Sequence, residues 1–176
     1  MLTEWESFYL LIGSAAAALI GLLFIVATLT AGIDRSSIER GTHFYMTPIV
    51  FHLSVILVLS SVALAPPLTA RAFGPLCGLA ALAGIARSAQ VFLGIRNTPA
   101  DPPTDWSDKW YYGAGPMLAY IALAPISVSF VMRRQWAEAG VAAVVVVLLL
   151  LGIRNAWDLV TYLAPKQKAD APQGEA

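Results

Sequence analysis

Five long hydrophobic runs are the feature that most limits what this chain can fold into. A helix of about 20 apolar residues spans the hydrocarbon core of a bilayer, which is roughly 30 Å thick. With 58% hydrophobic and only 12% charged residues among 176, little of the chain remains for a soluble domain. The sequence therefore predicts an all-α fold, a polytopic membrane bundle of five transmembrane helices in a single domain over residues 1–164. The segment 165–176, rich in Lys, Ala, Pro and Gln, is predicted to be a disordered tail.

Helix starts are expected where capping and proline residues precede the apolar runs. Thr3 and Glu6 have the spacing of a capping box, and Thr47 can cap a helix that has Pro48 at its first position. Pro75 is expected to open the third span. Asp105 and Asp108 can cap the fourth, and the fifth begins at Ala137. The expected spans end near Leu29, Ala65, Ile95, Arg133 and Leu163.

Small residues recur at helical spacing in two of the runs. Gly13, Ala17 and Gly21 are four apart in the first run, and Gly84 belongs to a series of small residues in the third. Such residues let membrane helices approach closely. We expect close packing within one bundle, with a subunit interface as the alternative.

Two prolines interrupt the fourth run. Pro116 and Pro125 each lack an N–H and leave the carbonyl four residues back, at Tyr112 and Ile121, without its helical partner. The fourth helix is therefore expected to be kinked. Kinks are common structural devices in membrane helices, and a role in gating or ion binding is the alternative.

Polar residues in three runs are the candidate functional site: His52, Arg87, Gln90, Arg154, Asn155 and Asp158. An ionisable residue in hydrocarbon costs roughly 2.5 to 3.5 kcal/mol on insertion scales, so such residues are usually paired, turned inward or functional. In a five-span topology these positions enter from one side of the membrane, at depths of about 7 to 15 Å. Arg154 and Asp158 are four apart and can neutralise each other, although Asp158 could equally accept from Arg87.

Simpler interpretations compete with a functional site. An Arg near a helix end can extend its head group to the interface, and a buried His is usually satisfied by a neighbour. His43 and His52 are nine residues apart, about 2.5 helical turns, so they face opposite ways and a two-His metal or haem site is disfavoured. The single Cys77 offers no intramolecular disulfide or thiol redox pair. We expect no metal and no cofactor.

The distribution of Lys and Arg predicts the orientation. Six lie on the side of residues 34–43, 97–109 and the C-terminal tail, and three lie on the other side. Lys and Arg favour the cytoplasmic side, so the N-terminus is expected outside and the C-terminus in the cytoplasm. Formal net charge is zero and the basic residues are scattered, which argues against a nucleic-acid partner.

Several segments together resemble a group of small uncharacterised bacterial multi-pass membrane proteins. They are Trp5-Glu6-Ser7-Phe8-Tyr9, Gly13-Ser14, Ala18-Leu19-Ile20-Gly21, Thr47-Pro48 with His52, Asn155-Ala156-Trp157-Asp158 and Val160-Thr161-Tyr162. The resemblance implies a bacterial inner membrane and no particular activity. In that group a His commonly stands where this chain has Arg154, so the His pair that would suggest a metal, haem or proton site is incomplete here. His52 and Asp158 are the positions that the resemblance marks for testing.

Two functional hypotheses follow. The first is a non-enzymatic homo-oligomer in the lipid bilayer that conducts or binds a small ion or polar solute. Arg87 would attract an anion and His52 would confer pH sensitivity, because an unperturbed imidazole titrates near neutral pH. The second is an interaction subunit that packs beside a larger membrane complex. An enzyme or redox carrier is disfavoured, because no nucleophile triad, His-rich metal motif, phosphate-binding Gly loop or Cys pair is present.

Overall fold

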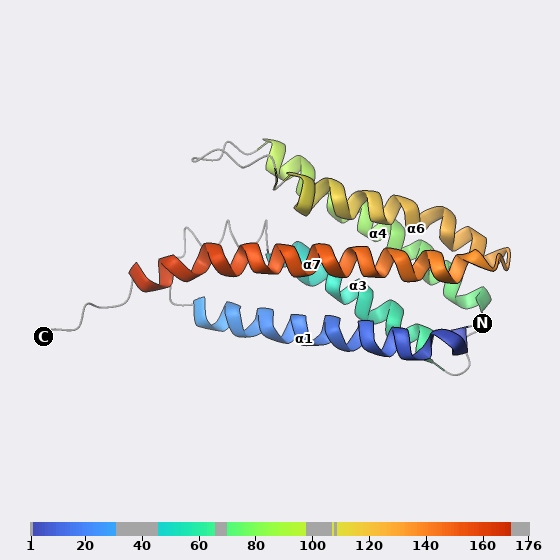
Figure 1. Ribbon diagram of the computed structural model, residues 1–176. Helices are drawn as coiled ribbons and strands as arrows, with labels where there is room; N and C mark the ends of the chain where they lie inside the picture. The colour runs from blue at the N-terminus through green and yellow to red at the C-terminus, as the bar shows by residue number, and fades with distance from the viewer. Residues whose placement is uncertain (1, 31–45, 66–69, 98–106, 108, 170–176) are drawn as a thin grey trace, which may run out of the picture.

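The computed structural model describes residues 2–30, 46–65, 70–97, 107 and 109–169, and no strand occurs among them (Figure 1). A short 3-10 helix, η1, precedes the first membrane helix, and a π-helix, η3, precedes α6. In chain order the elements are η1 (Leu2–Trp5), α1 (Glu6–Thr30), α3 (Thr47–Leu64), α4 (Ala70–Asn97), η3 (Lys109–Ala114), α6 (Gly115–Val131) and α7 (Trp136–Ala169).

Five stretches in the described part of the chain are long and apolar enough to cross a membrane, which confirms the predicted all-α, five-span architecture. They are Glu6–Leu29, Thr47–Leu64, Ala72–Gly94, Lys109–Val131 and Trp136–Thr161. Successive spans run in opposite directions (Figure 1). We call the end that holds the starts of α1, α4 and α7 the N-side, and the opposite end the C-side.

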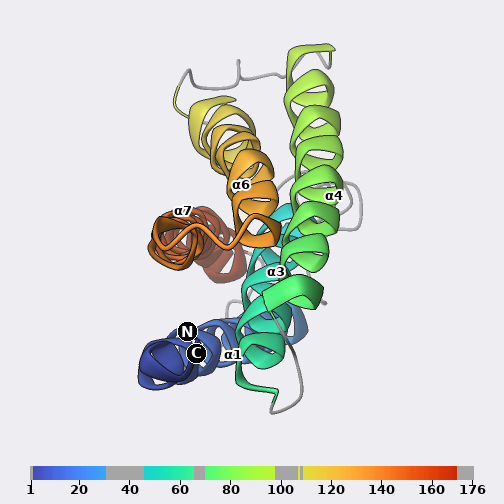
Figure 2. The ribbon, with the colours of Figure 1, turned by 90° about the vertical axis from the view of Figure 1, so that its right-hand side faces the viewer.

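Helix α7 is the most buried of the five spans. It packs against α1, α3 and α6, between the α1–α3 pair and the α4–α6 pair (Figure 2). Half of the apolar stretch of α7 is buried inside the protein, against 22% for α1 and 28% for α4. The peripheral helices α1 and α4 instead expose apolar side chains such as Leu11, Phe24 and Leu82. Exposed apolar surface of this kind is suited to lipid, which is as apolar as these side chains.

The α4–α6 contact is built on small residues, as predicted for Gly84. A Cβ placed on Gly74 would lie 3.0 Å from the carbonyl oxygen of Ser127, and one on Gly84 would lie 2.3 Å from the ring of Tyr120. Real Cβ atoms do not approach that closely. These glycines therefore allow α6 to rest directly on the backbone of α4.

The small residues of α1 behave differently from the expectation. Gly13 is buried against Ser60 of α3, but Ala17 and Gly21 are exposed, and a Cβ on Gly21 would meet nothing within 4 Å. A step of four residues advances about 40° around a helix of 3.6 residues per turn, so the three positions diverge from one contact line. The expectation that all three share a packing face inside the bundle is wrong. The buried stripe of α1 is Tyr9, Ile12, Gly13, Ala16 and Leu23.

Several helices extend beyond their expected ends. Met46 already has helical angles (φ −72°, ψ −47°), so Thr47 lies inside the helix and is not its cap. Helix α4 starts at Ala70 and includes Pro75. Helix α7 continues to Ala169, so the first residues of the predicted tail are helical. Pro75 and Pro165 each remove one helical hydrogen bond without ending the helix. His43, Asp105, Asp108 and residues 170–176 lie outside the described residues.

Candidate functional site

His52 is buried in the second turn of α3 and is joined to α6. Its side chain is only 3% exposed, and its Nδ1 lies 2.9 Å from the hydroxyl oxygen of Tyr120. Either atom can donate, depending on the tautomer of the ring. The other ring nitrogen, Nε2, is buried and has no hydrogen-bond partner in the described structure. His52 thus has one satisfied nitrogen and one nitrogen available to a ligand or a water molecule.

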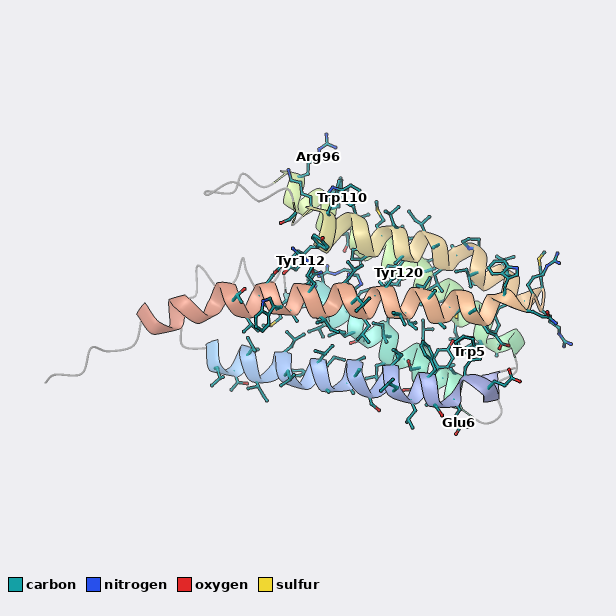
Figure 3. The ribbon with its side chains drawn as sticks, viewed as in Figure 1. Trp5, Glu6, Arg96, Trp110, Tyr112 and Tyr120 are labelled. Atoms are coloured by element: carbon teal, nitrogen blue, oxygen red, sulfur yellow. The ribbon has the colours of Figure 1, made fainter. Side chains whose placement is uncertain are left out.

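Tyr120 is held in place by Gly84. Three ring carbons of Tyr120 lie 2.3 to 2.4 Å from the point where a Cβ of residue 84 would be, so the ring rests on the bare backbone of α4. Tyr120 lies on the side of α6 that faces the rest of the bundle (Figure 3). The Gly84–Tyr120 contact therefore positions the hydroxyl group that binds His52. No sequence motif marks Tyr120, and only its place in a mid-membrane helix could have suggested it.

Arg87 follows Gly84 by one turn of α4 and is half-buried. Its Nη1 lies 3.5 Å from Oε1 of Gln90, a long contact, and its positive charge acts on His52. No carboxylate pairs with Arg87 within the part of the chain that the structure describes. Arg87 is seven residues from the end of its span at Gly94, which corresponds to a depth of about 10 Å. We call His52, Arg87, Gln90 and Tyr120 the C-side cluster.

Arg154 and Asp158 form a pair of their own. Nη1 of Arg154 lies 2.6 Å from Oδ2 of Asp158, and both side chains are about one third exposed. The guanidinium carbon also lies 3.4 Å from the ring centroid of Tyr111, a cation–π contact. The expected neutralisation of Arg154 by Asp158 is confirmed. The alternative contact between Asp158 and Arg87 is not the one that the structure contains.

Asn155 binds the backbone just before the fourth helix. Asn155 is buried, and its side-chain Nδ2 donates to the backbone carbonyl of Tyr111 at 2.9 Å. The backbone carbonyl of Asn155 accepts a hydrogen bond from the Tyr112 hydroxyl at 2.9 Å. In the π-helix η3 each carbonyl would bind the N–H five residues ahead. For Tyr111 that residue is Pro116, which has no N–H. The freed carbonyl is therefore that of Tyr111 rather than Tyr112, because the local helix is π and not α.

Pro125 does not interrupt its helix. It lies inside the continuous helix α6, and its own carbonyl accepts a hydrogen bond from the Ser129 hydroxyl at 3.0 Å. A Ser hydroxyl bonded one turn back is a local contact that is often seen in bent helices. Near Pro116 the chain changes from π- to α-helix at Gly115. The kink at this proline stays a prediction.

The six predicted polar residues thus fall into two groups. His52, Arg87 and Gln90 belong to the C-side cluster. Arg154 and Asn155 join α7 to the π-helix η3, and Asp158 pairs with Arg154. The described residues contain no group of three His, Cys, Asp or Glu side chains that could hold a metal ion. Sequence reasoning missed Glu138, which is 7% exposed in the first turn of α7. An acid inside the first turn of the fifth hydrophobic run was the available signal.

Comparison with known proteins adds no identity to this picture. No protein-family model, no curated protein and no solved structure matches this chain. The resemblance to small bacterial membrane proteins stays a prediction that rests on the segments quoted for it.

Proposed function

We propose that this membrane protein binds a small anion or an anionic polar solute at the C-side cluster. The proposal rests on the positive charge of Arg87 inside the span. Its possible partner Asp158 is already paired with Arg154, so no carboxylate among the described residues compensates the positive charge of Arg87, which lies about 10 Å inside the span. A charge in that position is costly unless an anion approaches it. A guanidinium is also well shaped to bind a carboxylate or phosphate with two parallel hydrogen bonds.

The exposure of the cluster suggests how a solute would enter. Gln90 is exposed, Arg87 is half-buried, and His52 is buried. An anion would first meet the Gln90 amide and the Arg87 guanidinium. The free Nε2 of His52 would then offer one donor or acceptor at the inner end, depending on the tautomer. The Lys and Arg distribution supports an opening toward the cytoplasm of a bacterial inner membrane.

The test is anion binding and anion flux by the purified full chain. Chloride, acetate and inorganic phosphate serve as probes, with thermal unfolding in mild detergent and flux into liposomes as readouts. We expect at least one probe to stabilise the wild-type protein and Arg87→Gln to abolish that effect. Arg96→Gln is the matched control, because Arg96 is exposed at the end of the same helix and its loss changes the net charge equally. An equal loss in both variants would indicate a general charge effect and contradict the site.

A second candidate is an interaction subunit of a larger membrane complex. The outward-facing small residues Ala17 and Gly21 favour it, because they leave a flat strip on α1 where another helix could pack. The same strip would serve a homo-oligomer. Native mass spectrometry of the protein from its own membrane separates the two: recovery only with other subunits supports the accessory role, and a homo-oligomer supports an independent binding or conducting protein.

A further inference from the structure

The turn between α6 and α7 holds an arginine in a backbone conformation that arginine seldom adopts. Arg133 has a φ angle of 56°, and among the described residues no other non-glycine residue has a positive φ. A left-handed backbone brings the Cβ of an L-residue close to the following carbonyl oxygen, so glycine is the usual residue in such positions. Strained positions that are occupied by other residues occur preferentially at ligand sites. The side chain of Arg133 is therefore a candidate ligand-binding group.

Backbone hydrogen bonds fix this turn on both sides. The N–H of Arg133 donates to the carbonyl of Phe130, and the N–H of Arg134 donates to the carbonyl of Ser129, both at 3.0 Å. Together these bonds form a Schellman motif, which ends a helix at a left-handed residue. The N–H of Ala137 then donates to the carbonyl of Arg134 at 3.1 Å, at the start of α7. Two consecutive arginines are thus carried by a turn with a defined backbone.

The position of the turn along the bundle places it at the level of lipid headgroups. Residues 132–135 lie between the end of the fourth span and the start of the fifth, at the N-side of the bundle (Figure 1). Arg133 and Arg134 are both exposed there. On either side of them, Met132 is 65% exposed and Trp136 is 55% exposed. Exposed tryptophans are typical of the membrane–water interface. The turn therefore presents two cationic groups between two apolar ones.

We propose that Arg133 and Arg134 bind the phosphate of an anionic phospholipid, while Met132 and Trp136 contact its acyl chains. A guanidinium can bind a phosphate with two parallel hydrogen bonds. No carboxylate of the described residues pairs with either arginine. The nearest acid in the sequence, Glu138, is buried in α7. Two adjacent positive charges favour a lipid with a net negative charge over a zwitterionic one. The proposal is independent of the anion site, which lies at the other end of the bundle.

The test compares the thermal unfolding of the full chain in nanodiscs of phosphatidylcholine alone and in nanodiscs that also contain phosphatidylglycerol. We expect the anionic lipid to raise the Tm of the wild-type protein by about 3 °C. Arg133→Gly should lose most of this increase. In phosphatidylcholine alone, however, the Tm of Arg133→Gly should equal or exceed that of the wild type, because glycine relieves the left-handed strain. A residue that only stabilised the turn would give the opposite result in the neutral lipid.

A second variant and a matched control complete the test. Arg134→Gln leaves the strained residue in place and should also reduce the response to the anionic lipid. Arg96→Gln removes the same charge from an exposed position at the opposite end of the bundle and should retain the response.

Three results would overturn the proposal. The first is a wild-type Tm that is the same in both lipid mixtures. The second is an equal loss of the lipid response in Arg133→Gly and Arg96→Gln, which would indicate a general charge effect. The third is an equal rise in Tm when soluble glycerophosphate is added to phosphatidylcholine nanodiscs, which would indicate a site for free phosphate and not for a lipid.

Discussion

At the scale of single residues, we predict opposite effects of alanine substitution at two glycines on the peripheral helices. Gly84 lies under the ring of Tyr120, whereas Gly21 faces open space. Gly84→Ala should lower the free energy of unfolding by about 1 to 3 kcal/mol through overpacking, and it should displace the hydroxyl that binds His52. Gly21→Ala should be neutral or slightly stabilising, since alanine is the better helix former. Thermal unfolding in detergent measures both, and equal effects would show that Tyr120 does not depend on Gly84 for its place.

At the scale of elements, the junction between η3 and α6 depends on a partner from α7. Asn155→Ala leaves the Tyr111 carbonyl without its hydrogen bond, and we expect a loss of about 1 to 3 kcal/mol in unfolding free energy. Pro116→Ala restores an N–H that can rejoin the helix, so the double variant should be more stable than the sum of the single losses. A double-mutant cycle by chemical or thermal unfolding measures the difference. Additivity within about 0.5 kcal/mol would mean that Pro116 does not create the need for Asn155.

Some features of this structure could be predicted from the sequence and others could not. Hydrophobic length determines the five spans, and the small residues around Gly84 correctly predicted a close helix contact. The spacing of Arg154 and Asp158 on one helix also predicted their pair. Contacts between helices far apart in sequence were not predictable, because they depend on which faces meet. The Tyr120 partner of His52, the π-register that frees Tyr111 and the exposure of Gly21 all belong to that class.

At the scale of the whole molecule, two buried polar side chains lie at different depths along α3. His52 belongs to the C-side cluster, Ser60 lies nearer the N-side, and Ile56 stands midway between them. All three side chains are buried, so each faces the interior of the bundle. Ile56 is completely buried, so an apolar side chain separates the two polar ones. In membrane proteins, hydrophobic constrictions keep water and ions from passing.

This arrangement predicts that Ile56 is a barrier between the two ends of the bundle. Ile56→Ser places a hydroxyl between Ser60 and His52, and we expect it to raise the proton or Na⁺ leak of liposomes that contain the protein. The loss of buried apolar contact should also cost about 2 to 5 kcal/mol, so flux is measured well below the unfolding temperature of the variant. Val58→Ser is the matched control, because Val58 is exposed on the same helix and its hydroxyl would face away from the line of polar residues. A leak that rises equally in both variants would reflect general loosening of the bundle, whereas a leak confined to Ile56→Ser would show that Ile56 is the barrier between His52 and Ser60.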